Sequence, residues 1–163
     1  MSLSNPYAAW PKEDTAGTLL HVSLPEKIIV AVDGSDPSFK ALSYATKLAG
    51  LIKSKVVVLN VKSLPPWTAA KTADVLKKDL SSKAADVLGK AKSIGRSNGV
   101  DVETRSIETS ESIVMAIVDF SNMEKVDLIV MGTKGTSGYG KMMLGSVAAG
   151  VVSFASCPVL AVR

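Results

Sequence analysis

The residues with the clearest chemical potential lie near the C-terminus, in a stretch that reads MGTKGTSGYGKMMLGSV over residues 131–147. Two residues separate Gly132 from Gly135, and nine separate Gly135 from the pair Gly145 and Ser146. Glycines let a backbone approach a ligand closely and turn N–H groups toward an anion. A helix that begins at Ser146 would add free N–H groups and a favourable dipole. The spacing therefore indicates a loop that binds phosphate, although an empty crossover loop explains it equally well.

A second pattern overlaps the first and is disfavoured by its chemistry. From Gly135 the chain reads GTSGYGKM, which nearly matches the P-loop pattern of Gly, four residues, Gly, Lys and then Ser or Thr. The P-loop needs that hydroxyl for magnesium, but Met142 follows Lys141 here. Lys134 and Lys141 could add positive charge to a phosphate site or simply point to water.

Composition excludes several other classes of site. The chain has 163 residues, with one cysteine, Cys157, and one histidine, His21. An internal disulfide is therefore impossible, and we expect neither a zinc site nor a Ser-His-Asp or Cys-His apparatus. The net charge of +4 is compatible with an anionic ligand. The lysine-rich stretch at 77–96 lacks interleaved aromatic residues, so we interpret it as a solvated helix face and expect no nucleic-acid binding.

The chain shows no sign of a membrane or secretory segment. No uncharged apolar run is long enough to cross a bilayer, and the N-terminus lacks a charged-then-apolar signal pattern. We therefore expect a cytoplasmic protein that does not bind membranes. Residues 1–26 contain prolines and no steady periodicity, and we interpret them as an N-terminal extension. Residues 27–163 are predicted to form one domain.

Short apolar runs alternate with amphipathic segments along that domain. Continuous apolar, β-branched runs are typical of strands buried on both faces. They predict strands at 27–32, 55–61, 126–131 and 158–162, and an alternating stretch predicts another at 100–107. Strands that alternate with helices pair in parallel through right-handed crossovers. The sequence therefore predicts an α/β fold with a doubly wound, five-stranded parallel sheet, a Rossmann-like sandwich.

The helices between these strands have recognisable beginnings. Asp36, which precedes a proline, is expected to be the N-cap of the first helix. A second helix is predicted over residues 73–98, and Thr109 or Ser110 is expected to cap the third. The fourth is predicted to open at Ser146.

The fold rule for such sheets locates the expected ligand site. In a doubly wound sheet, ligands bind beyond the carboxyl ends of the strands, where the strand order reverses. The ends of the first and fourth strands, at Asp33 and Gly132, are the natural positions.

Three blocks of the sequence, taken in order, resemble the universal stress protein family. KIIVAVDGSDPSFKAL resembles the family's first strand and turn, VDLIVMGTKGTSGYGKMMLGSVAAGVV its fourth strand and nucleotide loop, and CPVLAVR its closing strand. The resemblance covers roughly residues 27–163. The spacing of Gly132, Gly135, Gly145 and Ser146 matches the pattern of the family's ATP-binding branch.

The resemblance implies an ATP site at the point where the strand order reverses. Asp33 would lie near the adenine or the ribose, where its carboxylate could accept from ribose hydroxyls, with a role at the helix start as the alternative. Val61 and Met131 would flank adenine, with core packing as an equally good interpretation. Ala31 stands where some ATP-binding members have proline, and Val147 would give an N–H group to phosphate. The predicted cofactor-binding residues are Ala31, Asp33, Val61, Met131, Gly132, Gly135, Gly145, Ser146 and Val147.

The implied function is that of an ATP-binding stress-response protein acting as a nucleotide-dependent regulatory module. AMP or another adenine nucleotide, with or without Mg²⁺, is an alternative ligand, because the length of the loop does not determine how many phosphates the ligand carries. No convincing set of catalytic residues stands out, so at most slow ATP hydrolysis is expected. The rival hypothesis is an interaction protein of the same fold that binds no nucleotide. An adenylyl transferase would need a His-containing motif, which this chain does not have.

The last predicted strand bears on assembly. CPVLAV is apolar and would invite aggregation if it lay exposed at a sheet edge. The resemblance implies that it pairs with its counterpart in a homodimer. Alternatively, TLLHVSL at residues 18–24 could cover that edge and leave a monomer.

Overall fold

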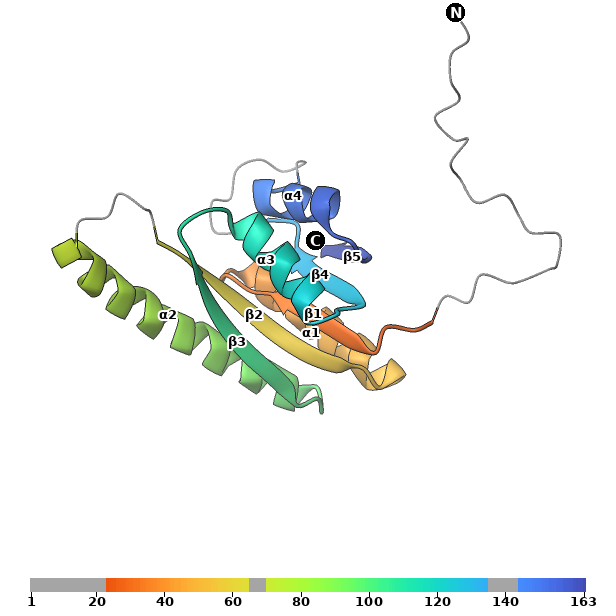
Figure 1. Cartoon of the computed structure of the whole chain (residues 1–163). Coiled ribbons are helices and arrows are strands. Elements are labelled where there is room, and N and C mark those ends of the chain that lie inside the picture. The colour runs from red at the N-terminus through yellow and green to blue at the C-terminus, as the bar shows by residue number, and fades with distance from the viewer. Residues whose placement is uncertain (1–22, 65–69, 135–143) are drawn as a thin grey trace, which may run out of the picture.

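Five strands form one parallel sheet in the order β3-β2-β1-β4-β5 (Figure 1). The structure is a computed structural model that describes residues 23–64, 70–134 and 144–163. The strands are β1 (Lys27–Ala31), β2 (Lys55–Ser63), β3 (Val102–Thr109), β4 (Leu128–Gly132) and β5 (Val159–Val162). The predicted doubly wound, five-stranded α/β fold is confirmed.

Four helices cover the two faces of this sheet. They are α1 (Asp36–Ile52), α2 (Ala70–Ser97), α3 (Ile113–Met123) and α4 (Ser146–Phe154). The helices α1 and α2 pack on one face, and α3 and α4 pack on the other (Figure 1). None of the helices in the described part of the chain combines the length and hydrophobicity that a bilayer crossing requires.

The central strand β1 shows why the apolar runs are continuous. Ile28 and Val30 point into the core formed with α1 and α2, while Ile29 points into the core formed with α3 and α4. All three side chains are fully buried. A strand covered on both faces needs apolar residues at successive positions, and each such side chain stabilises the fold by about 1.5–3 kcal/mol.

The predicted N-cap of α1 is wrong by one residue. Ser35 is the cap, and its hydroxyl accepts a hydrogen bond from the N–H of Ser38 at 3.3 Å. Asp36 is instead the first helical residue. Its carboxylate is still favourable there, because the first turn of a helix carries partial positive charge.

The predicted cap of α3 is also wrong, because the preceding strand is longer than its apolar pattern. The ladder between β2 and β3 continues to the pair Ser63 and Thr109, so Thr109 is a strand residue. The cap moves to Ser112, whose hydroxyl accepts from the N–H of Met115 at 3.3 Å.

A close approach fixes the first turn of α1 against the end of β4. A Cβ atom on Gly132 would lie 2.9 Å from the carbonyl carbon of Pro37 and 3.0 Å from its oxygen. Both are backbone atoms, which cannot rotate out of the way. Gly132 is therefore required by helix packing, and the approach of a ligand that the sequence suggested stays a prediction.

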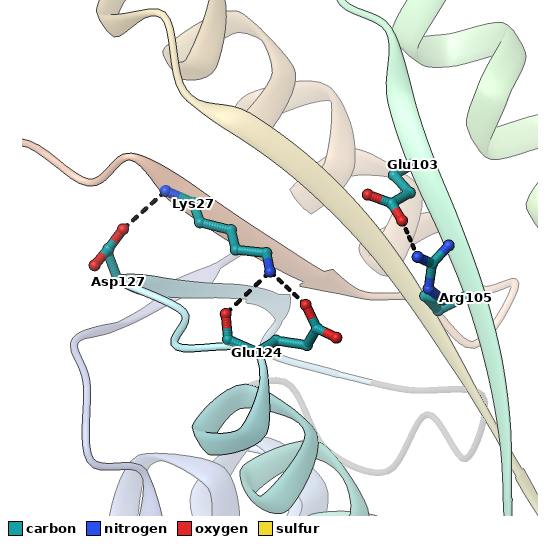
Figure 2. Close-up of polar contacts among 5 residues, drawn as sticks. All are labelled: Lys27, Glu103, Arg105, Glu124 and Asp127. Atoms are coloured by element: carbon teal, nitrogen blue, oxygen red, sulfur yellow. Dashed lines mark hydrogen bonds and ion pairs between the residues drawn. The ribbon is translucent and has the colours of Figure 1, made fainter.

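At the opposite end of the sheet, side chains hold the start of β1 in place (Figure 2). The Lys27 ammonium group donates to the backbone carbonyl of Glu124 at 3.0 Å and pairs with its carboxylate. The Asp127 carboxylate accepts from the backbone N–H groups of Lys27 at 2.8 Å and of Glu26 at 3.0 Å. These bonds join the entry to β1 with the end of α3 and the approach to β4.

The ion pair at this end makes stability depend on pH. The hydrogen bond and the charge of Lys27 lower the pKa of the Glu124 carboxyl, and the charge of Arg105 adds to the effect. Arg105 itself pairs with Glu103 on β3 (Figure 2). Because the folded-state pKa of Glu124 lies below its unfolded value, the stabilisation is present above the unfolded pKa. It is lost as the pH falls through the folded pKa.

We predict that Glu124→Gln lowers the denaturant midpoint at about pH 7 and that this difference shrinks as the pH falls below the ordinary glutamate pKa. Chemical unfolding of both proteins across this pH range measures the effect. In a Lys27→Met background, Glu124→Gln should change the pH profile much less, since only the charge of Arg105 then favours the ionised Glu124 carboxyl. A difference between the wild-type and Glu124→Gln proteins that persists undiminished at low pH would contradict the assignment.

We further predict that Gly132→Ala destabilises the protein by about 1–3 kcal/mol, because the new methyl group forces α1 and β4 apart. Gly89→Ala is the matched control, since nothing lies within 4 Å of a Cβ at that position of α2. It should stabilise the protein by about 0.5–1 kcal/mol through helix propensity. Equilibrium unfolding should therefore show that the free energy of unfolding falls in Gly132→Ala and rises in Gly89→Ala. Equal changes in the two variants would refute the packing explanation.

Candidate functional site

A cavity of about 210 Å³ opens at the carboxyl ends of β1 and β4, where the strand order reverses. The two ends lie side by side, because Ala31 pairs with Met131 in the ladder between these strands. Eight of the nine predicted site residues line the cavity, namely Ala31, Asp33, Val61, Met131, Gly132, Gly145, Ser146 and Val147. The ninth, Gly135, lies outside the described residues, as does Lys141.

One wall of the cavity is apolar. Val61 and Met131 belong to it, as predicted, and three residues that sequence reasoning missed complete it: Leu59, Ile113 and Ile117. Leu59 and Met131 are nearly or fully buried and pack in the core with α3 and α4. Val61 and Met131 therefore pack in the core and also line the cavity, and their contact with adenine stays a prediction.

The missed residues had weak signals in the sequence. Leu59 lies two positions before Val61, and alternate residues of a strand share a face. Ile113 and Ile117 are four residues apart, which places them on one face of a helix. Neither spacing says which cavity the residues face, because that depends on how α3 packs on β2.

The turn after β1 aims a carboxylate at the cavity rim. One Asp33 oxygen accepts from the Ser35 N–H at 3.0 Å and from the Ser35 hydroxyl at 2.6 Å. Gly34, between them, has a φ of 89°, a conformation that glycine adopts without strain. Asp33 thus shapes the turn that precedes α1 and also lines the cavity. The role at the helix start is confirmed, and contact with ribose hydroxyls stays a prediction that this position allows.

A buried amide supports this turn from below. The Asn60 side chain, 7% exposed, donates to the carbonyl of Val32 at 2.9 Å. The Val32 N–H donates to the Leu59 carbonyl at 2.9 Å, so β2 holds the residue before Asp33 at two points. Sequence reasoning missed Asn60. A single polar residue within an otherwise apolar strand was the available sign that its side chain has a buried hydrogen-bond partner.

Opposite the turn, α4 directs its N-terminus at the cavity. Gly145 is the N-cap, and its N–H donates to the Thr133 carbonyl at 2.7 Å, which brings the two ends of the glycine loop together. Ser146 is therefore the first helical residue, as the sequence predicted. The N–H of Ala149 donates to the Gly145 carbonyl at 2.8 Å. The N–H groups of the preceding helical residues, Ser146 and Val147 among them, have no such partner inside a helix.

The charge of this rim suits an anion. Lys134 lines the cavity beside the first turn of α4, as the sequence allowed. The helix dipole adds partial positive charge at the same place. Within the described residues, no group of three or more His, Cys, Asp or Glu side chains is placed to hold a metal ion.

Comparison with known proteins agrees with the fold and the resemblance. A model of the universal stress protein family matches residues 25–163. A universal stress protein of Methanocaldococcus jannaschii is 33% identical over 144 residues, which are 86% of this chain and 84% of the relative. Among solved structures, a universal stress protein of Archaeoglobus fulgidus in complex with dAMP is 30% identical, with a TM-score of 0.65 over 84% of this chain and 97% of that one.

A second solved structure, a universal stress protein in complex with cAMP, is 28% identical and has a TM-score of 0.69. The match covers 86% of this chain and 99% of the other. The residues that the family model matches include β1, β4 and the segment between β4 and α4. The chain belongs to the universal stress protein family.

Proposed function

We propose that the chain is a regulatory module that binds an adenine nucleotide in the cavity between β1 and β4, with ATP as its ligand. One observation carries the proposal: an apolar wall faces a helix N-terminus across the cavity, and a carboxylate stands at the rim. An adenine nucleotide has the same order of groups, a flat apolar base, a sugar with hydroxyl donors, and a charged phosphate.

Each part of the ligand has a matching group in the cavity. The base lies between Val61 and Met131, in the apolar part. The ribose hydroxyls donate to Asp33, a charge-assisted bond of the stronger kind. The phosphates accept from the N–H groups of Ser146 and Val147 at the start of α4, where backbone and dipole both favour anions.

Two relatives support the class of ligand. One universal stress protein was solved in complex with dAMP and another with cAMP. Each of these ligands contains an adenine base and a phosphate. ATP with Mg²⁺ shares these groups and adds charge that the Lys134 side of the cavity would favour. Two further expectations belong to the proposal. Residues 27–163 form the domain, with residues 1–26 as an extension, and the protein acts in the cytoplasm.

We propose binding rather than rapid turnover. The carboxylate and the hydroxyl at the end of β1 bond to each other, since Ser35 donates to Asp33 at 2.6 Å. A general base is most effective when it reaches the substrate or its attacking water directly. Bound nucleotide would instead stabilise the folded chain by mass action and so change its availability to partners. The rival proposal remains an interaction protein whose cavity holds no nucleotide.

Calorimetric titration of the full chain with ATP and Mg²⁺, with AMP and with cAMP tests this proposal. We predict saturable binding of at least one of them, and Asp33→Asn should weaken it by about 1.5–3 kcal/mol, roughly 10- to 150-fold. Asparagine still accepts the hydrogen bonds that shape the turn, so the loss of affinity measures the contribution of the negative charge at this position.

Asp36→Asn is the matched control, because Asp36 is exposed and is not among the described residues that line the cavity. It should leave the affinity unchanged. If none of the three nucleotides binds at millimolar concentration, the proposal fails and the interaction protein becomes the better explanation. If Asp33→Asn and Asp36→Asn weakened binding equally, the role assigned to Asp33 would be wrong, but the proposal that the chain binds a nucleotide would stand.

We also propose that the chain forms a homodimer through β5. The two edges of the sheet differ in character: β3 carries Glu103, Arg105 and Glu108, whereas β5 reads VLAV and is only partly covered. Charged edge strands resist pairing with another chain, and apolar ones invite it. The β5 edge therefore suits a second copy.

Hydrogen bonds show which backbone groups of β5 are available for pairing. The N–H groups of Ile129 and Thr133 donate to the carbonyls of Pro158 and Val162, so these two residues direct their carbonyls at β4. Successive residues of a strand direct their groups to opposite sides. Ala161 consequently directs its N–H and carbonyl away from β4.

We predict that Ala161→Pro converts a dimer into a monomer, because proline removes an outward N–H while the ladder with β4 keeps its donors. Ala161→Ser retains the N–H and should remain dimeric. Sedimentation velocity over a range of concentrations measures both. A wild-type chain that stays monomeric at high concentration would remove the dimer from the proposal.

A further inference from the structure

The strand order sets the direction in which a nucleotide would lie across the cavity. Leu59 and Val61, in the apolar wall, belong to β2, Asp33 follows β1, and the first turn of α4 follows β4. The strands β2, β1 and β4 are consecutive in the sheet. A base, a ribose and a first phosphate would therefore lie at the ends of β2, β1 and β4 in turn. Further phosphates would continue in the same direction, toward the end of β5.

Arg163 follows β5 at the place where that direction leads. Gly132 and Val162 are partners in the parallel ladder between β4 and β5, so both strands end at the edge of the sheet that holds the cavity. The Thr133 N–H donates to the Val162 carbonyl at 2.9 Å, and the Thr133 carbonyl accepts from the Gly145 N–H at 2.7 Å. Thr133 alone therefore connects the residue before Arg163 with the N-cap of α4.

The alternation of β5 indicates the face on which Arg163 lies. Val159 packs against the core formed with α3 and α4, whereas Leu160 and Val162 pack against the core formed with α1 and α2. Successive side chains of a strand point to opposite faces, so Arg163 falls on the face that carries α4. On this face α4 contacts β5 (Figure 1). This position allows the guanidinium group to reach the space in front of the first turn of α4.

The charge of Arg163 is available to a ligand. Arg163 is exposed, and within the described ranges it takes part in no ion pair. The acids at the end of β1 and the start of α1, Asp33 and Asp36, do not pair with it. Lys134 lines the cavity just after β4. The two cations thus follow neighbouring strand ends, Lys134 after β4 and Arg163 after β5.

We propose, on the basis of the function proposed above, that Arg163 binds the phosphates beyond the first and makes the site prefer ATP to AMP. A guanidinium group presents its donors in a fixed plane, which suits bidentate hydrogen bonding to phosphate oxygens. AMP ends at the first phosphate, beside the N–H groups of α4, and leaves Arg163 in solvent. The additional phosphates of ATP extend to the end of β5 and bring their charge to Arg163.

Calorimetric titration of the full chain with AMP, ADP and ATP, each with Mg²⁺, tests the proposal. The affinity of the wild-type chain should rise along this series. Arg163→Gln should weaken ATP binding by roughly tenfold and AMP binding by less than about twofold, because only the longer ligand reaches the lost donors. Arg163→Lys keeps the charge without the planar group and should lose less affinity for ATP than Arg163→Gln.

Arg96→Gln is the matched control, because Arg96 is also exposed and lies in the last turn of α2. It removes the same charge and should leave all three affinities unchanged. If Arg96→Gln and Arg163→Gln weakened ATP binding equally, the effect would come from net charge and the proposal would fail.

Lys134→Gln gives an internal comparison within the site. Lys134 lines the cavity beside the first turn of α4, so its loss should weaken AMP and ATP by similar factors. The ratio of the two affinities should therefore change in Arg163→Gln and stay nearly constant in Lys134→Gln. If the ratio changed equally in both variants, the assigned order of phosphates along the strand ends would be wrong.

The outcomes separate this inference from the function on which it rests. A wild-type chain that binds AMP at least as tightly as ATP would overturn the role of Arg163 and leave nucleotide binding intact. The same holds if Arg163→Gln weakens AMP and ATP equally, or leaves the affinity for ATP unchanged. If the wild-type chain binds none of the three nucleotides, the proposed function fails and the role of Arg163 fails with it.

Discussion

The cavity depends on the way in which two neighbouring strands send their chains to opposite faces of the sheet. β1 and β4 pair directly, but α1 covers one face and α4 the other. Neither helix can therefore close over the ends of both strands, and the space between their first turns stays open. The contact of Pro37 with Gly132 fixes the width of this opening on the side of α1, since any side chain at Gly132 would displace the helix.

The same divergence sets the electrostatics of the site. The turn before α1 brings the carboxylate of Asp33 to one rim, and the first turn of α4 brings backbone donors to another. Hydroxyl donors and phosphate acceptors of one ligand can thus be satisfied at the same time. The buried amide of Asn60 contributes by holding the end of β1, which keeps the carboxylate on the correct side of the opening.

The fold was predictable from sequence because buried parallel strands leave a strong local pattern, such as Ile28, Ile29 and Val30 in succession. The positions of Asp33 and Gly132 at the cavity followed from the fold rule. The helix caps were less predictable, since Ser112 caps α3 only because the ladder with β2 extends β3 to Thr109.

The rest of the site arises from packing between distant segments, which no local pattern encodes. Ile113 and Ile117 meet Leu59 at the cavity because α3 crosses the end of β2. Gly132 was expected at the site for its freedom to approach a ligand, whereas its neighbour in space is Pro37. Similar reasoning explains Asn60, whose acceptor lies 28 residues away along the chain.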